Sequence, residues 1–384
     1  MDIVNKDGAI INQYYAKEKD EKGNVVTKSP KAGNNVETTL DITIQQVAEE
    51  ALEEVMGNIT NPEINTKEGE NEGLDAQGAA VIVMECQTGN ILACASYPSF
   101  DLANMMKQEV WDEINKDELN PLFNRAFGAE YPPGSTYKMC TLISAMENYS
   151  TKKQDLILKY GETIEDKGVF TEFDGFAPTC LAWSSQRFTH GVIDGTLALC
   201  YSCNYFFYQL GAWNNEDNMA NTAEALGLGV PTGIELIEKT GRVNTAEVKK
   251  QVYGNSGVNS SFTAGDRVLG AIGQGENRFT PLQLCVYAST LANKGTRMKA
   301  TFLSRVVSAD YKTLIKENQP QIMNQIEMAG TTIETYWQGM RKVVTVPGGT
   351  ADAYFGGPDA SFNNAPRFPI TIPFCESRST IIVA

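Results

Sequence analysis

Apolar and polar residues follow distinct patterns along this chain, and two of them near the start predict regular structure. The segment TTLDITIQQVAEEALEEVM carries apolar residues near helical spacing, and Asp41 within it is a residue type that caps helices. We therefore expect a helix of about four turns after Asp41. Further on, GAAVIVMECQTGNILACASYP contains two β-rich runs around QTGN, which predicts a hairpin.

A third apolar pattern follows two prolines. Spacings of three, one and three residues separate Met139, Leu142, Ile143 and Met146, which predicts a helix with one buried face. Helical patterns recur at 193–213 and 264–295, and short β-rich pieces such as TFLSRVVSA follow. A hairpin, then many helices, then strands predicts an α/β protein of the α+β type rather than regular βαβ alternation.

The chain has 384 residues, enough for one large or two modest domains with an ample core. Residues 1–36 are polar, charged and punctuated by glycine. They predict irregular chain or the remnant of a preceding module. Helical periodicity begins only after this segment, so we place a domain boundary near residue 37.

Charge and hydropathy limit the classes of partner. The 32 basic and 47 acidic residues give a formal charge of -15, which repels nucleic-acid backbones and anionic lipid heads. No apolar run approaches the roughly 18 residues that a membrane helix needs. The first residues also lack the pattern of a signal peptide, so we expect either a cytoplasmic protein or a chain that begins after its export signal.

Eight cysteines are scattered along the chain, and free, mostly buried thiols are the simplest interpretation. Cys200 and Cys203 form a CxxC pair, a spacing found in zinc and redox sites. No second CxxC supplies further ligands. The sequence therefore predicts neither a metal nor an organic cofactor.

Candidate chemistry lies in YPPGSTYKMC, where Ser135 and Lys138 stand three positions apart and so share one face of a helix. A serine becomes nucleophilic when a neighbour takes its proton, and a lysine does this once burial lowers its pKa. A helix cap followed by a surface lysine is the alternative on spacing alone. His190, the one histidine, is more often a structural residue than the base of a triad.

The sequence around these residues resembles the transpeptidase domain of class B penicillin-binding proteins. The resemblance runs from about Thr38 to Phe355 and includes NRAFGAEYPPGSTYKM, HGVIDGTLALCYSCNYFFYQLG and AIGQGENRFTPLQLCVYASTLANKG. Ser135 and Lys138 fill the SxxK motif of that family. Ser202 and Asn204, in SCN, match its second motif, and the CxxC is then incidental.

The resemblance implies a fold, an activity and partners. The fold is the one shared with serine β-lactamases, an antiparallel sheet flanked by helices plus a helix-rich lobe, here over residues 37–384. The activity is D,D-transpeptidation of peptidoglycan stem peptides through an acyl-serine, which β-lactam antibiotics trap. Ser202 would pass a proton to the leaving amine, and the Asn204 amide would hold Lys138 and the substrate backbone. Wall-synthesis proteins such as a polymerising glycosyltransferase would be partners, at the outer face of the bacterial membrane on an anchor that this chain lacks.

The third motif of the family, Lys-Thr/Ser-Gly on a strand, does not follow GGTADAYF, although FPITI reads as the approach to it. We interpret the chain as divergent or truncated after about residue 356, with incomplete C-terminal strands, unpaired sheet edges and impaired activity. A literal KTG at 239–241 lies in a stretch where the family has a loop, so we expect it to play no catalytic part.

Two rival functions remain open at this point. A serine β-lactamase would also hydrolyse its acyl-enzyme and would turn over a chromogenic cephalosporin. A non-catalytic sensor or interaction module would keep the fold but resist every acylating probe. The absence of the third motif favours the second rival, and the long N-terminal approach argues against the first.

Overall fold

A computed structural model describes residues 2–4, 10–13, 16–19, 21–28, 32–63, 75–148, 155–256, 260–352 and 380–383. FPITI and most of the divergent tail lie outside these residues. The chain divides into two compact units, residues 1–38 with 303–318, and residues 39–302 with 319–384. Both contain antiparallel strands, and helices flank the sheet of the second, as the sequence predicts for the fold class.

The first unit is built from short antiparallel strands. Strands therefore occur within residues 1–36, where irregular chain was one interpretation. In its largest sheet β11 lies between β12 and β5, and Arg305 Nε lies 2.6 Å from Glu37 Oε2 across the β11–β5 pair. The strands are β1 (Asp2–Val4), β2 (Ile10–Gln13), β3 (Ala16–Lys19), β4 (Val25–Lys28), β5 (Asn35–Thr38), β11 (Leu303–Val307) and β12 (Leu314–Glu317).

The second unit contains the predicted hairpin. Strand β6 (Ala79–Glu85) pairs antiparallel with β7 (Ile91–Tyr97), and β14 (Thr380–Val383) pairs with the other side of β6. The expectation of an unpaired edge is therefore wrong along β6 from Ile82 to Glu85, because β14 supplies the missing hydrogen bonds. Unpaired strand edges are costly, so this pairing protects the sheet.

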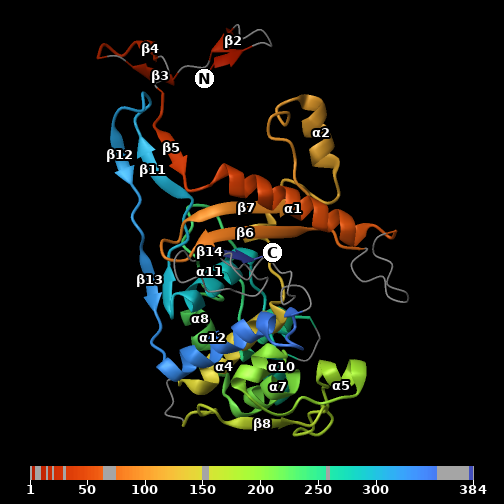
Figure 1. Cartoon of the computed structure of the whole chain (residues 1–384). Helices are drawn as coiled ribbons and strands as arrows, with labels where there is room; N and C mark the ends of the chain where they lie inside the picture. Colours follow the sequence, from red (N-terminus) through yellow and green to blue (C-terminus); the bar gives the residue numbers. More distant parts are fainter. Residues whose placement is uncertain are drawn as a thin grey trace. The chain divides into compact units, whose positions relative to one another are not determined.

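Helix α1 (Ile42–Thr60) covers one face of this sheet and α11 (Pro281–Ala292) covers the other (Figure 1). Asp41 caps α1, as predicted, by accepting the N–H groups of Thr43 and Ile44. Alternation along β6 divides the core, because side chains of a strand point to opposite faces in turn. Val81 and Val83 pack with α1, while Ile82 belongs to the larger core on the other side.

The rest of the second unit is mostly helical, with a few short strands. Its helices are α2 (Gln108–Lys116), α3 (Arg125–Gly128), the 3-10 helix η1 (Gly134–Tyr137), α4 (Lys138–Met146), α5 (Leu181–Gln186), α6 (Gly195–Cys200), α7 (Asn204–Trp213), α8 (Glu216–Ala225), α9 (Ala246–Tyr253), α10 (Ala264–Gly270) and α12 (Gly330–Thr345). The strands are β8 (Thr163–Asp166), β9 (Gly191–Asp194), β10 (Thr296–Met298) and β13 (Ile322–Gln325).

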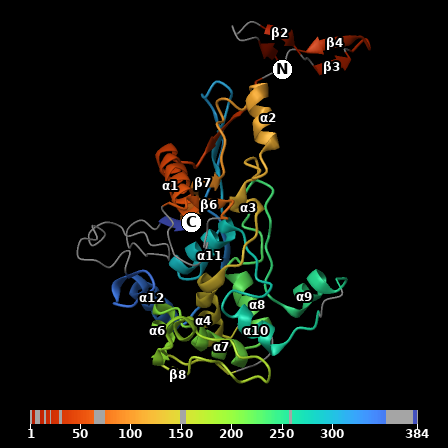
Figure 2. The same ribbon diagram turned by 90° about the vertical axis from the view of Figure 1, so that its right-hand side faces the viewer.

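Helix α4 packs among α6, α7, α8 and α12, and these helices form a helical lobe (Figures 1 and 2). All of its residues are buried, so the expectation of a single buried face is wrong. The polar side chains stay satisfied, since Thr141 donates to Ala271 O at 2.7 Å and Ser144 Oγ accepts from Asn214 Nδ2 at 2.8 Å. Truncating the fully buried Leu142 to alanine would cost about 2–5 kcal/mol.

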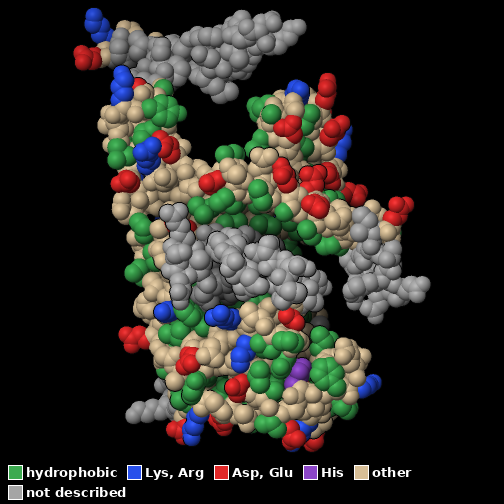
Figure 3. All heavy atoms as spheres, in the orientation of Figure 1, with side chains coloured by type: hydrophobic (Ala, Val, Ile, Leu, Met, Phe, Trp, Pro, Cys, Tyr) green, Lys and Arg blue, Asp and Glu red, His purple; other side chains and the backbone are tan. Residues whose placement is uncertain are grey.

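The outer side of α1 is acidic. Four exposed glutamates, Glu49, Glu50, Glu53 and Glu54, follow one another along it, and acidic side chains gather on the surface around α1 and α2 (Figure 3). Such a surface repels polyanions at long range. Among the described residues, no helix is long and apolar enough to cross a bilayer.

Candidate active site

Ser135 lies in η1, the short 3-10 turn that leads into α4, and its side chain is exposed. The backbone of this turn is held by glycine contacts. Gly134 has φ 55° and donates to Gly273 O at 3.1 Å. A Cβ on Gly273, which has φ 75°, would lie 2.0 Å from Gly134 O. Glycine is therefore required at 273 for the loop to approach the turn that carries Ser135.

Aromatic residues fix the following turn. The Tyr137 ring stacks on Phe279, with ring centres 6.1 Å apart and an interplanar angle of 7°. The Tyr287 hydroxyl accepts from Cys140 N at 3.0 Å and donates to Thr136 O at 3.1 Å. These contacts join η1 to α4, so the positions of Ser135 and Lys138 are set by buried packing.

Lys138 is 1% exposed, which is rare for a lysine. Its Nζ donates to Ser202 O at 2.8 Å, Ser202 Oγ at 2.9 Å and Asn204 Oδ1 at 2.6 Å. Burial lowers the pKa of Lys138 from 10.5 to about 8, because removal from water disfavours the charged amine. An amine in this range accepts a proton near neutral pH.

Ser202 and Asn204 lie where α6 ends and α7 begins. Ser202 has φ 50°, a left-handed conformation that only a few per cent of non-glycine residues adopt. The Ser202 hydroxyl lies 3.1 Å from Ser135 Oγ. The structure thus brings the four predicted residues together, with Ser202 Oγ between Ser135 Oγ and Lys138 Nζ. Their catalytic roles stay predictions.

The literal KTG lies in a loop rather than on a strand, and Lys239 is exposed. Its backbone N–H donates to Phe127 O at 3.0 Å. The segment after GGTADAYF, where the third motif of the family is expected, lies outside the described residues except for 380–383. The described part of that segment, Thr380–Val383, contains no lysine.

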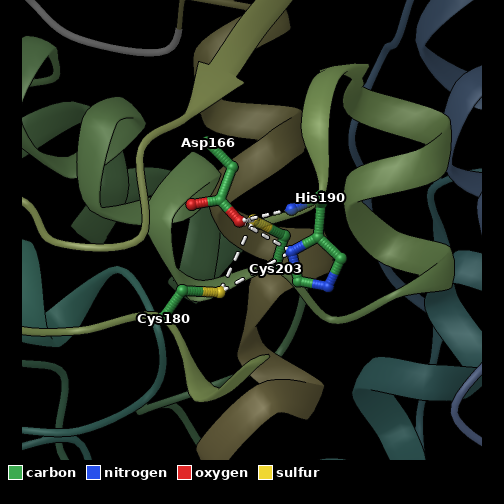
Figure 4. A group of neighbouring side chains, drawn as sticks. All are labelled: Asp166, Cys180, His190 and Cys203. Atoms are coloured by element: carbon green, nitrogen blue, oxygen red, sulfur yellow. Dashed lines mark hydrogen bonds and ion pairs between the residues drawn. The ribbon is translucent and has the colours of Figure 1, made fainter. Parts of the chain in front are cut away.

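The structure brings together a second group of reactive side chains, which the sequence did not predict (Figure 4). Asp166, Cys180, His190 and Cys203 place one ligand atom each within 4.8 Å of one another, a set able to hold a metal ion. Only Cys203 belongs to the CxxC pair. The other members are separated along the chain, and two cysteines and the single histidine within 24 residues were the available signal.

The side chain of His190 makes its hydrogen bonds within this group. Its Nδ1 lies 2.8 Å from Asp166 Oδ2 and 3.7 Å from Cys180 Sγ. The hydrogen bond from Cys203 lowers the pKa of the Cys180 thiol to about 4, and the same contact raises that of Cys203. Contact with Cys180, and then with Asp166, raises the pKa of His190. The prediction that His190 is structural therefore agrees with its contacts.

Comparisons with known proteins agree with the family resemblance seen in the sequence. Residues 79–360 match the family model described as the penicillin binding protein transpeptidase domain. Among curated proteins, the peptidoglycan D,D-transpeptidase MrdA of Escherichia coli is 27% identical over 356 residues, which cover 89% of this chain and 49% of that protein. The peptidoglycan D,D-transpeptidase PbpA of Mycolicibacterium smegmatis is 27% identical over 289 residues, 73% of this chain and 51% of that protein. The chain thus spans about half the length of these relatives.

Solved structures show the same fold. A structure described as the structural coordination of polymerization and crosslinking by a peptidoglycan synthase complex matches with a TM-score of 0.70 and 27% identity, over 88% of this chain and 54% of that one. Penicillin-binding protein PBP2 from Helicobacter pylori matches with a TM-score of 0.65 and 24% identity, over 87% of this chain and 55% of that one. A complex of PBP2 with MreC from the same organism matches with a TM-score of 0.65 and 23% identity, over 89% of this chain and 56% of that one.

Proposed function

This chain belongs to the penicillin-binding protein transpeptidase domain family, and from that premise we propose that it is a serine D,D-transpeptidase. The observation that carries the proposal is the hydrogen-bond path from Ser135 Oγ through Ser202 Oγ to the buried amine of Lys138. A helix-capping serine followed by a surface lysine would not be joined by such a path. It supplies what a serine nucleophile needs, a route for its proton to a base.

Lys138 is the base in this mechanism. An ammonium group has three N–H donors, and Ser202 O, Ser202 Oγ and Asn204 Oδ1 accept all three. When Lys138 is neutral, one of these bonds is lost and a lone pair can face Ser202 Oγ. Ser135 then gives its proton to Ser202 while Ser202 gives its own to Lys138.

The freed Ser135 oxygen attacks the carbonyl carbon between the two D-alanines of a stem peptide. An ester bond to Ser135 forms, the amide C–N bond breaks, and the leaving D-alanine amine takes the proton that Lys138 holds, relayed by Ser202. In the second step an amine of a neighbouring stem peptide attacks the ester. A new amide forms and Ser135 regains its proton, so the sites return to their starting state.

Substrate, partners and location follow from the relatives and are part of the proposal. Two relatives are named peptidoglycan D,D-transpeptidases, which supports stem peptides as substrates and β-lactams as inhibitors. Similar structures include a peptidoglycan synthase complex and a PBP2–MreC complex, which supports a place beside wall-synthesis proteins such as a glycosyltransferase. This chemistry requires access to peptidoglycan, so we place the site at the outer face of the cytoplasmic membrane.

Covalent labelling tests the proposal. A fluorescent penicillin should add one acyl group per chain, and peptide mapping should locate it at Ser135. Ser135→Ala should abolish the label, while the control Ser185→Ala, at an exposed serine of α5, should retain it. A label at another residue, or no label on the folded chain, would contradict the proposal. Rapid turnover of a chromogenic cephalosporin would instead indicate a β-lactamase.

A further inference from the structure

We propose that Tyr287 is a positioning residue for the acyl transfer, because its hydroxyl holds open the helix turn that aligns Ser135 with Lys138. Tyr287 lies in α11 and is 1% exposed. The inference rests on the proposed function, since it explains how the nucleophile and its base are kept in line. The structural part of the inference, the open turn, can be tested without any activity.

The Tyr287 hydroxyl takes the place of one backbone hydrogen bond. In an uninterrupted α-helix each N–H donates to the carbonyl four residues earlier, so Cys140 N would donate to Thr136 O. Here the hydroxyl bridges these two groups, because it accepts from Cys140 N at 3.0 Å and donates to Thr136 O at 3.1 Å. A side chain inserted between helix groups in this way changes the course of the helix. The bridge therefore separates the turn that carries Ser135 from the regular part of α4.

The turn before the bridge has the geometry that the pair needs. It is a 3-10 helix, η1, and the Lys138 N–H donates to Ser135 O, three residues earlier. Side chains three residues apart eclipse one another in a 3-10 helix, whereas in an α-helix they are rotated by about 60°. The 3-10 turn thus keeps the Ser135 side chain in line with that of Lys138. A direct bond between Cys140 N and Thr136 O would extend α4 toward Ser135 and rotate the two side chains apart.

Tyr287 is itself held in place by the sheet. Helix α11 lies between the β6–β7 sheet and α4 (Figures 1 and 2). Cys285 Sγ lies 3.9 Å from Ile82 O, and Ser289 Oγ donates to Cys86 O at 3.4 Å. Residues two positions apart lie about 200° apart around a helix, so these contacts are on the side of α11 away from Tyr287. The sheet therefore supports the tyrosine from behind.

The bridge does not change while the base titrates. Burial raises the pKa of the Tyr287 hydroxyl well above its usual value, because the charged phenolate is disfavoured away from water. The hydroxyl therefore keeps its proton near pH 8, where Lys138 gains and loses its own. The effect of the bridge on the rate can thus be measured separately from the protonation of the base.

A matched pair of variants tests the positioning role. Tyr336 in α12 is 0% exposed, and its hydroxyl donates to Leu291 O at 3.0 Å. Tyr287→Phe and Tyr336→Phe each remove one buried hydroxyl and keep the ring. At saturating penicillin, the acylation rate constant of the folded chain should fall about tenfold or more in Tyr287→Phe. It should fall less than about twofold in Tyr336→Phe. Equal losses, or no loss in Tyr287→Phe, would overturn the proposal.

The pH profile separates positioning from a general loosening of the site. In Tyr287→Phe the midpoint of the profile should stay near that of the unaltered chain, because Lys138 keeps its contacts with Ser202 and Asn204. Only its alignment with Ser135 is lost. A midpoint shifted toward the ordinary pKa of lysine would show that the variant exposes the amine, and this would overturn the positioning role.

A crystal structure of the full-length Tyr287→Phe variant tests the open turn without any activity. Cys140 N should lie about 3 Å from Thr136 O, as in a regular α-helix. A water molecule in the place of the hydroxyl, with the 3-10 turn unchanged, would overturn the proposal. If the bond closes but the unaltered chain is never acylated, the proposed function is refuted and the role of Tyr287 in the turn stands.

Two replacements of similar size keep the test valid if Tyr287→Phe does not fold. At position 287, 4-fluorophenylalanine fills the space of the hydroxyl but cannot donate to Thr136 O, so acylation should be slow. By contrast, 4-aminophenylalanine has both N–H donors and a lone pair, and should restore at least about a third of the normal rate. Similar rates with the two replacements would overturn the proposal.

Discussion

Two lysines of this chain stand in motifs known from serine acyl-transferring enzymes, and they differ in burial and in the contacts of the amine. Lys138, in SxxK, is 1% exposed and its amine donates to oxygens of Ser202 and Asn204. Lys239, in KTG, is exposed in a loop. Burial and fixed hydrogen-bond acceptors change the pKa of an amine. A match to a motif in the sequence does not by itself do so.

The KTG loop has a packing reason for its glycine. Gly241 has φ 63°, and a Cβ there would lie 2.5 Å from Arg278 O and 2.7 Å from Gln283 Oε1. Arg242 N then donates to Arg278 O at 2.7 Å. The glycine thus allows two backbone segments to meet, which explains its presence without catalysis.

The largest effect should come from removing the buried amine. Lys138→Met keeps a long unbranched side chain but leaves Ser135 without a base, so acylation should slow by about a thousandfold or more. The rate constant would be followed by intact-mass spectrometry with a penicillin. Lys250→Met, at an exposed position of α9, serves as the control and should react at the normal rate. If the Lys138→Met chain were acylated at a similar rate, Lys138 would not be the base, and the two lysines would not differ in function.

The pH dependence of acylation should report the lowered pKa of Lys138. The base is the neutral amine, whose fraction is about a tenth at pH 7 and half near pH 8, given a pKa of about 8. The acylation rate constant should therefore rise roughly tenfold between pH 7 and pH 9 and then level off. The profile would be measured under single-turnover conditions, with folding checked at each pH. A rate constant that keeps rising past pH 10 would indicate that Lys138 has the ordinary pKa of a surface lysine.

The smallest effect should come from the second lysine. Lys239→Ala removes an exposed side chain whose backbone contacts remain, so acylation should change by less than about twofold. The same mass-spectrometric assay would measure it. Loss of labelling with an unchanged far-UV spectrum and melting temperature would show that the loop KTG takes part in the reaction.

Local spacing made half of the candidate site predictable. Ser135 and Lys138 lie three residues apart at a helix start, so their proximity requires no tertiary information. Ser202 and Asn204 were found only through the resemblance to the family. The fold class and the β6–β7 hairpin also followed from sequence, because alternation and turn residues are local signals.

Features that depend on contacts between residues far apart in the sequence were not predicted. The pattern of α4 predicts one apolar stripe, but the polar Thr141 and Ser144 are buried as well, since their partners are the residues that directly follow α10 and α7. In the sequence, the CxxC pair is the one pattern that suggests metal ligands. Cys203 instead lies near Asp166, 37 residues away, because the start of α7 packs against β8. Non-local pairing of this kind leaves little trace in a single sequence.

The contact between Gly134 and Gly273 limits which mutations can alter the proposed nucleophile's turn. Both glycines hold positive φ, and the 2.0 Å that a Cβ at 273 would leave to Gly134 O admits no side chain. In a saturation library selected for reaction with penicillin, glycine alone should survive at position 273. Under antibiotic selection, no substitution at Gly273 would be available to lower the affinity of the protein for the drug. Such changes would have to occur in residues that surround the turn.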